Sequence, residues 1–227
     1  MVVSSQYERE LRQVLAGVPK GVEAVIRSCN PLEKQKMRQV LQRPFLVVRA
    51  AGSGMEGTGD LLALRGDLCF PIEVKSTRPK KLYLSGRTKL QYEAMVTEGE
   101  RCNLMPLYAH RQKGMRGDSW RIFRVETSNL SGRLRQLEKS IPPFPTTRNG
   151  SVYLNWEDGM PLHAFIALVC SSAGAENHAL HNLEVRTLRT NVFAKPLPTT
   201  QLEDILPAQT ISEKPLDVLA ELARRRS

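Results

Sequence analysis

Cysteine is scarce in this sequence. The 227 residues include four cysteines, none of which forms a Cys-x-x-Cys pair: Cys29, Cys69, Cys102 and Cys170. This wide spacing argues against a zinc site and against a disulfide framework. We therefore expect the thiols to be reduced, as they are in an intracellular protein.

Long apolar runs are also missing. The longest unbroken run of note, Ala164–Cys170, is far too short to span a bilayer. Residues 1–6 lack the apolar core of a signal peptide. We therefore expect a cytoplasmic protein that does not associate with membranes.

The histidines do not form a metal-binding pattern. His178 and His181 lie three residues apart, but no convincing third ligand accompanies them. We interpret them, together with His110 and His163, as surface residues.

Basic residues outnumber acidic ones. The chain has 33 Lys and Arg against 23 Asp and Glu, a net charge of +10, and an isoelectric point of about 9.7. Such an excess favours a polyanionic partner, with nucleic acid ahead of an anionic membrane. The alternative is a soluble protein that is simply basic.

One stretch, which we call the basic segment (residues 75–91), contains no acidic residue at all. Its six basic residues are Lys75, Arg78, Lys80, Lys81, Arg87 and Lys89. A solvated surface more often mixes both signs of charge, so this segment is a candidate for phosphate contacts.

The most informative pattern lies just before the basic segment and ends at its first residue, Lys75. Asp60 opens an apolar run, a turn follows, and a second apolar run contains Ile72-Glu73-Val74-Lys75. Alternate residues of a strand share a face, so Glu73 and Lys75 should point one way and their apolar neighbours into the core. If the two runs pair as a hairpin, Asp60 approaches Glu73.

Two carboxylates that lie close together repel each other unless a divalent cation sits between them. A lysine beside such a cation can hold or activate a water, which suits metal-assisted phosphodiester hydrolysis. The simpler interpretation is that Glu-x-Lys is an ordinary exposed strand pattern. However, the pattern occurs once in this chain, inside an apolar strand where unpaired charges are costly.

Periodicity and turn residues predict an α/β protein, with helices on the faces of a sheet. Asn30 and Glu33 have capping-box spacing for the second helix, and Pro71 suggests an edge position or a bulge in its strand. The expected helices cover residues 7–15, 31–42, 87–98, 130–139 and 162–170. The expected strands cover 45–49 (buried), 60–64, 68–76, 105–109, 120–125 and 152–156. We expect residues 171–227 to form a loosely ordered tail.

Four motifs in order resemble the archaeal Holliday junction resolvase family, a branch of the PD-(D/E)xK nuclease superfamily. They are Tyr7–Leu11, Val48–Gly54, Asp60 with Ile72–Ser76, and Lys81–Leu84 with Gln91. A weaker likeness continues to about residue 170. The resemblance implies a restriction-endonuclease-like fold, a mixed central sheet flanked by helices, over residues 1–170, with residues 171–227 as a C-terminal extension. Residues 17–44 look like a helical insertion, and Gly59 stands where proline is usual.

The resemblance also implies roles for individual residues. Asp60 and Glu73 would bind Mg²⁺, or Mn²⁺ as a substitute, with the Val74 carbonyl assisting. Glu8 would complete the metal site.

The remaining catalytic roles fall on three residues. Lys75 would orient or activate the attacking water, and Gln91 would support that water. Ser53 would lie near the scissile phosphate. The resemblance and the charge pattern together assign DNA contacts to Arg9, Arg49, Arg78, Lys80, Lys81, Arg87 and Lys89.

The family resemblance further implies a homodimer that nicks opposing strands of a four-way DNA junction, without an organic cofactor and in association with the nucleoid. Two alternatives stay open. One is a general or sequence-specific nuclease on the same fold, and the other is a DNA-binding module that has lost catalysis.

Overall fold

The structure is a computed structural model, and it describes residues 3–50 and 57–171. The chain divides into two units, Met1–Ser172 and Ala173–Ser227, and the first contains all the described residues. The tail expected over residues 171–227 therefore lies almost entirely outside the described residues.

The first unit contains six α-helices among its described residues: α1 Val3–Leu15, α2 Pro19–Ile26, α3 Pro31–Gln42, α4 Arg87–Cys102, α5 Gly132–Glu138 and α6 Leu162–Cys170. Its strands are β1 Leu46–Arg49, β2 Leu61–Arg65, β3 Leu68–Thr77, β4 Lys81–Tyr83, β5 Leu107–Gln112, β6 Trp120–Arg124, β7 Tyr153–Asn155 and β8 Met160–Pro161. A 3-10 turn, η1, covers Trp156–Asp158.

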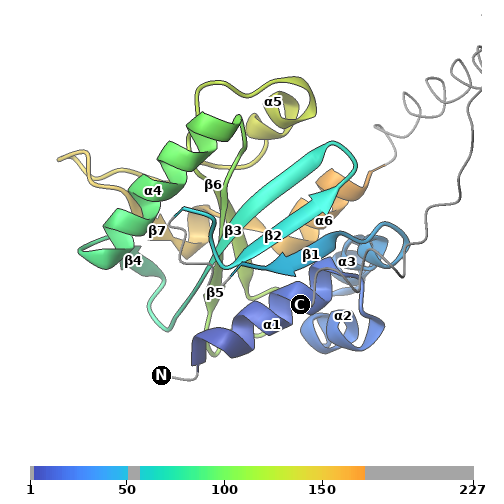
Figure 1. Ribbon diagram of the computed structural model, residues 1–227. Coiled ribbons are helices and arrows are strands. Elements are labelled where there is room, and N and C mark those ends of the chain that lie inside the picture. The colour runs from blue at the N-terminus through green and yellow to red at the C-terminus, as the bar shows by residue number, and fades with distance from the viewer. Residues whose placement is uncertain (1–2, 51–56, 172–227) are drawn as a thin grey trace, which may run out of the picture. The chain divides into compact units, whose positions relative to one another are not determined.

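The main sheet has the strand order β1-β2-β3-β5-β6-β8. β3 and β5 run parallel, and the other neighbouring strands are antiparallel. Strands β4 and β7 form a separate two-stranded sheet beside the start of α4 (Figure 1). The predicted class, a mixed central sheet flanked by helices, is confirmed.

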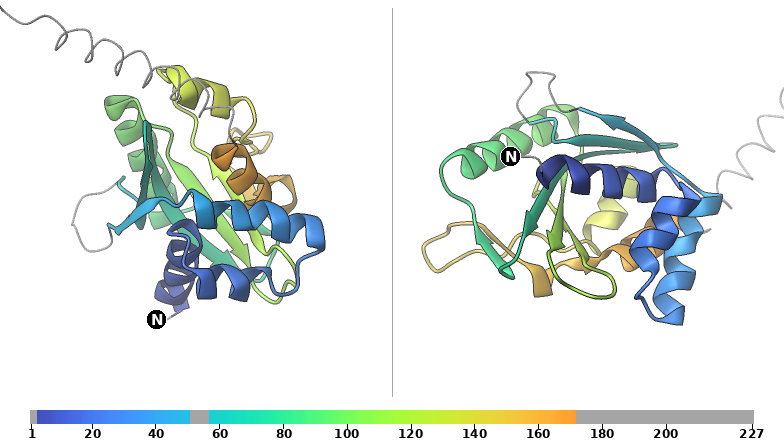
Figure 2. Two further views of the ribbon diagram at one scale, coloured as in Figure 1. Left: turned by 90° about the vertical axis from the view of Figure 1, so that its right-hand side faces the viewer. Right: turned by 90° about the horizontal axis from the view of Figure 1, so that it is seen from below.

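Each face of the sheet has its own core, because alternate strand residues point to opposite faces. The larger core joins α1, α2, α3 and α6 to one face, and Ile72 and Val74 of β3 point into it. The smaller core lies under α4, where Met95 packs with Tyr108 and Phe123. Helices α4 and α6 accordingly cover opposite faces of the sheet (Figure 2).

The capping box predicted at Asn30 and Glu33, which begins α3, is confirmed. Asn30 accepts a hydrogen bond from Glu33 N at 2.9 Å, and the Glu33 carboxylate accepts one from Asn30 N at 3.0 Å. These reciprocal bonds satisfy amides that the helix itself leaves without partners. Helix α2, which precedes it, was not predicted individually; it has no side-chain cap, although Pro19 begins it.

Two local predictions are wrong, and a third strand has an unexpected partner. The strand expected to be buried at 45–49 is an edge strand, β1, and Leu46 is 69% exposed. The strand carrying Pro71 is central in the sheet rather than an edge strand. Proline is tolerated because β3 pairs with β5 only from Ile72 onward, so Pro71 has a strand neighbour on one side alone. The strand expected at 152–156 is present as β7, and it pairs with β4 outside the main sheet.

His110 and His163 are not surface residues. His110 is fully buried in β5, and its Nε2 lies 2.8 Å from Thr77 Oγ1. His163 is partly buried, and its Nδ1 lies 2.8 Å from Asp118 Oδ2. Each ring has a polar side-chain partner at hydrogen-bond distance, which explains how both are accommodated away from bulk water. His178 and His181 lie outside the described residues.

The four cysteines are free thiols. In the part of the chain that the structure describes, no helix combines the length and apolar character needed to cross a membrane.

Candidate active site

The β2–β3 hairpin brings Asp60 to Glu73. Leu61 pairs with Ile72, and Asp60 N continues the ladder by donating to Ile72 O at 2.8 Å. Gly59 makes this approach possible, since its φ is +72° and a side-chain Cβ there would lie 2.6 Å from Ile72 O. The hairpin on which the predicted site depends is therefore present.

Asp60 lies in an environment that opposes its ionisation. Burial, followed by the nearby Glu73 carboxylate, raises the pKa of Asp60 to about 6. The Val74 amide, which donates to Asp60 Oδ2 at 2.8 Å, acts in the opposite direction, and Glu8 adds a further raising contribution. Glu73 and Glu8 therefore both act electrostatically on Asp60.

Lys75 lies at the centre of a short polar chain. Its Nζ donates to Glu73 Oε1 at 2.7 Å and to Gln91 Oε1 at 2.9 Å. Glu73 and Lys75 share the face of β3 that faces α4, as the alternation predicted, and Gln91 comes from α4. The Glu73 and Lys75 side chains are only 7% and 17% exposed, so this pair is shielded from solvent.

Glu8 reaches the same region from α1, even though more than thirty residues separate it from β1. Its side chain is buried, and its Oε2 lies 3.2 Å from the Arg49 guanidinium of β1. Its effect on the pKa of Asp60 places it within electrostatic range of the hairpin. The residues 17–44 therefore do not displace α1 from the site.

The described residues contain no group of three or more His, Cys, Asp and Glu side chains arranged to hold a metal ion. The donor chemistry nevertheless fits Mg²⁺ or Mn²⁺, which prefer oxygen ligands. Among hydrogen bonds within the described residues, one reaches each carboxylate, at Asp60 Oδ2 and at Glu73 Oε1. The mutual repulsion of the two carboxylates favours a cation between them.

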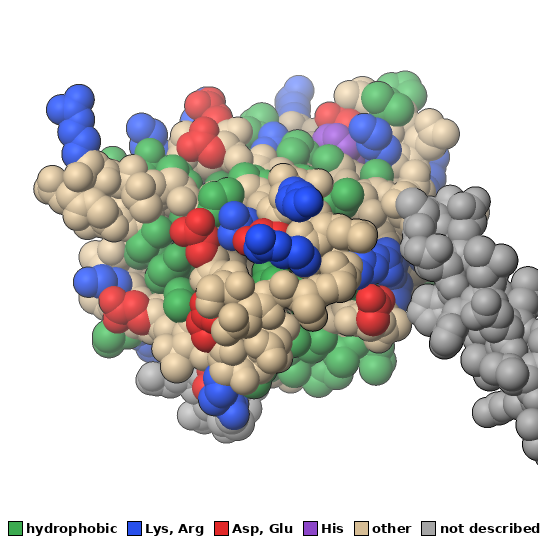
Figure 3. Space-filling view, turned by 90° about the horizontal axis from the view of Figure 1, so that it is seen from above, with side chains coloured by type: hydrophobic (Ala, Val, Ile, Leu, Met, Phe, Trp, Pro, Cys, Tyr) green, Lys and Arg blue, Asp and Glu red, His purple; other side chains and the backbone are tan. Residues whose placement is uncertain are grey.

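The residues predicted to contact DNA differ in their surroundings. Arg9, Arg78, Lys81 and Arg87 are exposed. The other three form ion pairs: Arg49 with Glu8, Lys80 with Glu157, and Lys89 with Glu93. The basic segment therefore carries less unbalanced charge than its sequence alone suggests. Figure 3 likewise shows basic and acidic side chains interspersed on the face seen from above. Ser53 lies outside the described residues.

Sequence reasoning missed two buried side chains on β5 that face the candidate site. Tyr108 pairs in register with Glu73, and His110 with Lys75. Burial and the Glu73 charge raise the pKa of Tyr108, while burial lowers the pKa of His110 to about 4. The alternation Leu107-Tyr108-Ala109-His110 contained this signal, because it places the two polar rings on one face.

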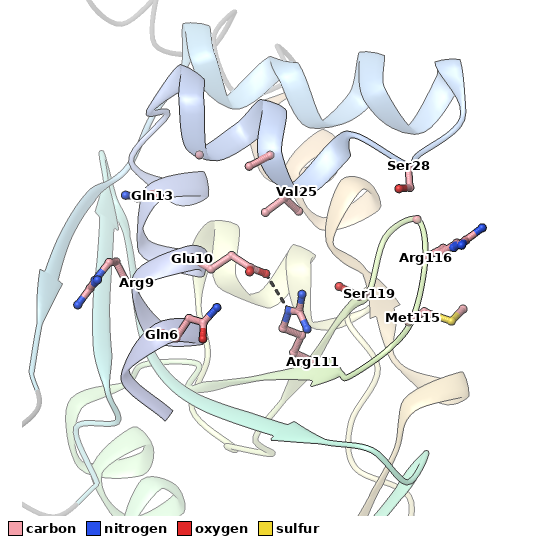
Figure 4. A pocket seen from close by; sticks show the side chains of 13 residues that line it. Gln6, Arg9, Glu10, Gln13, Val25, Ser28, Arg111, Met115, Arg116 and Ser119 are labelled. Carbon is pink, nitrogen blue, oxygen red and sulfur yellow. Dashed lines mark hydrogen bonds and ion pairs between the residues drawn. The ribbon is translucent and has the colours of Figure 1, made fainter. Parts of the chain in front are cut away.

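The cavity of about 370 Å³ between α1, α2 and the β5–β6 loop is not part of this site (Figure 4). Its one carboxylate, Glu10, accepts hydrogen bonds from Arg111 Nε at 2.8 Å and Trp120 Nε1 at 2.9 Å. The Arg9 and Arg116 side chains point away from its centre in Figure 4. Glu10 therefore has a structural role in joining α1 to the sheet.

Comparison with known proteins points to one family. Residues 30–134 match the family model of archaeal Holliday junction resolvases, Hjc. This match confirms the resemblance predicted from the sequence. It contains α3, Asp60, Glu73, Lys75 and Gln91, whereas α1 with Glu8 and residues 17–29 precede it.

A solved structure that matches is Hjc from Archaeoglobus fulgidus, described as a Holliday junction resolvase from an archaeal hyperthermophile. It is 21% identical, with a TM-score of 0.39, and the match covers 62% of this chain and 98% of that chain. No curated protein matches the chain.

Proposed function

We propose that this protein is a Mg²⁺-dependent, structure-selective DNA endonuclease that resolves four-way junctions by paired symmetric nicks. The observation that carries the proposal is the approach of Asp60 to Glu73 on the β2–β3 hairpin, with Lys75 bonded to Glu73. All three residues lie within the span that matches a resolvase family.

Asp60 and Glu73, with the Val74 carbonyl, would hold the divalent cation. When bound, Mg²⁺ would lower the pKa of a coordinated water and offset charge on the phosphate. Lys75 would orient the attacking water from its position beside Glu73. Gln91 would act as a positioning residue, because its Oε1 restrains Lys75 Nζ.

Two further residues would contribute from outside the hairpin. Glu8 would add a third carboxylate from α1 to the pair formed by Asp60 and Glu73, once DNA or metal draws Arg49 away from it. Ser53 would lie near the scissile phosphate.

Recognition would depend on shape and phosphate geometry rather than on base sequence. Exposed basic side chains, among them Arg9, Arg78, Lys81 and Arg87, would contact the backbone, so affinity should fall steeply with salt. Two active sites in a homodimer would each cut one of two opposing strands. Such a protein would act in the cytoplasm on chromosomal DNA during recombination and repair.

The test is incubation of the purified protein with a synthetic four-way junction and, separately, with linear duplexes of the same arm sequences, with and without Mg²⁺. We expect paired, symmetric nicks in the junction that require Mg²⁺ and leave 5′-phosphates. Equal cutting of the linear duplexes would indicate a general nuclease on the same fold. Binding to the junction without any cutting would indicate a catalytically silent module.

A further inference from the structure

The small β4–β7 sheet presents two stacked tyrosines on its outer surface. Tyr83 and Tyr153 are register partners, with ring centroids 5.4 Å apart and an interplanar angle of 29°. Tyr83 is 59% exposed and Tyr153 is partly buried. The Tyr83 ring is thus stacked on one side and open to solvent, which leaves it free to contact a ligand.

The register of this small sheet fixes which side chains face outward. Leu82 pairs with Leu154, and both pack in the smaller core under α4. Their neighbours on each strand must point the other way. Lys81, Tyr83 and Tyr153 therefore share the outer face, which places an ammonium group two residues from the exposed ring.

Trp156 anchors this surface to the rest of the fold. Its backbone N donates to Lys80 O at 2.7 Å, and its Nε1 donates to Ser119 O at 3.0 Å. The Arg121 guanidinium lies 3.6 Å from the centre of its ring. Since Trp156 directly follows β7, the tyrosine pair is held in place before any ligand arrives.

The small sheet is also connected directly to the candidate active site. β4 lies in the chain between β3, which carries Lys75, and α4, which carries Gln91. Lys75 Nζ donates to Gln91 Oε1, so the two elements that flank β4 in the chain meet at the candidate active site. A ligand on the tyrosines would therefore bind a segment whose two flanking elements both carry residues of the candidate site.

The chemistry of this surface selects its ligand. Aromatic rings stack on nucleobases of any sequence, and a neighbouring cation contacts the phosphate that accompanies the base. Glu157, which follows β7, is already paired with Lys80, and Lys81 also lowers its pKa. We infer that Tyr83 and Tyr153 form a stacking platform for an unpaired base of the DNA substrate, with Lys81 on its phosphate.

This inference rests on the proposed function only in taking DNA as the ligand, and it adds a way of selecting DNA with unpaired bases. It is tested by fluorescence anisotropy with two labelled probes, a short oligothymidylate and a blunt duplex of equal length. We compare Tyr83→Ala, Tyr153→Ala and Tyr83→Phe with the wild type. Leu90→Ala is the matched control, because Leu90 is 63% exposed on α4.

We expect each Tyr→Ala change to weaken oligothymidylate binding about 5- to 150-fold and duplex binding far less, since stacking contributes roughly 1–3 kcal/mol per base. Tyr83→Phe and Leu90→Ala should keep wild-type affinity. Unchanged oligothymidylate affinity in Tyr83→Ala would overturn the inference. A loss of subunit association in that variant, measured by light scattering, would also overturn it and assign the tyrosines to a protein interface.

These outcomes do not depend on cleavage. A wild-type protein that binds oligothymidylate through Tyr83 but leaves four-way junctions intact would contradict the proposed function and support this inference. If Tyr83→Ala and Tyr153→Ala nick junctions normally and bind oligothymidylate with wild-type affinity, the proposed function is supported and this inference is contradicted.

Discussion

The β2–β3 hairpin and the basic segment that follows it differ in how their charges are held. Asp60 and Glu73 are largely removed from water, and Lys75 is bonded on both sides. Beyond Lys75, the charged side chains are exposed, and two of them, Lys80 and Lys89, pair with nearby acids. Buried charges need fixed partners, whereas exposed pairs are weak and easily exchanged.

This difference suggests a division of labour between the two regions. The hairpin has a fixed geometry that suits chemistry at one phosphate. The basic segment has exchangeable partners that suit contacts along a flexible backbone. Changes in the hairpin should therefore affect the rate of cleavage, and changes in the basic segment should affect affinity and its dependence on salt.

The largest effect is expected from Asp60→Asn. Loss of this carboxylate should lower the single-turnover rate of junction cleavage on the order of 10³-fold, because metal-assisted charge stabilisation contributes several kcal/mol. The dissociation constant for the junction should change little. The matched control is Asp67→Asn, since Asp67 lies exposed in the turn of the same hairpin. Retained cleavage by Asp60→Asn would remove Asp60 from the site.

Lys75→Ala should lower the rate of junction cleavage more than Gln91→Ala does. Removal of Lys75 should lower the single-turnover rate about 10²- to 10³-fold, as expected for a group that handles the attacking water. Removal of Gln91 should cost about tenfold, because it acts through Lys75. Both variants should keep junction affinity. A larger loss in Gln91→Ala than in Lys75→Ala would show that the amide has its own role.

The pH dependence of the free energy of unfolding should reveal how unfavourable the ionised Asp60 carboxylate is in the fold. Its pKa in the fold is raised from 3.8 to about 6, so its contribution to stability is fully present below about pH 4 and is lost as the pH rises through 6. Without divalent cations, Asp60→Asn should therefore become more stable than the wild type above pH 6, by on the order of 1–3 kcal/mol.

Denaturant unfolding at pH 4 and pH 7.5 measures this difference directly. Addition of Mg²⁺ at pH 7.5 should stabilise the wild type and not the variant. A difference between the two proteins that is the same at both pH values would contradict the raised pKa.

The smallest effects are expected in the basic segment. Lys81 is exposed, and Lys81→Ala should reduce the salt dependence of junction binding by about one phosphate contact. Lys80→Ala should have a smaller effect, because Lys80 is already paired with Glu157. The slope of log K against log salt gives both values. Equal slopes in Lys81→Ala and the wild type would exclude a phosphate contact for Lys81.

The features that could be predicted from the sequence are those determined by residues close together in the chain. Strand alternation placed Glu73 and Lys75 on one face, and a short turn fixed the hairpin that brings Asp60 to them. The Asn30 cap and helix α6 also followed from local residues. These features need only neighbours in the chain, which is why a single sequence is sufficient to predict them.

Features that depend on distant partners were not predicted. The ion pair of Arg49 with Glu8 joins α1 to β1, and that of Lys80 with Glu157 joins residues 77 positions apart. The pairing of β7 with β4, rather than with the main sheet, is likewise invisible to local pattern. The burial of His110 was missed, and the residue that accommodates its ring, Thr77, lies on another strand.

The most direct measurement is calorimetric titration of the protein with Mn²⁺ and Mg²⁺ at pH 7.5, in the wild type, Asp60→Asn and Glu73→Gln. If the two carboxylates share one cation, each substitution should weaken binding by more than about 100-fold, since even outer-shell partners of a metal site contribute 10- to 100-fold. Wild-type cation affinity in both variants would contradict a shared metal site on the hairpin.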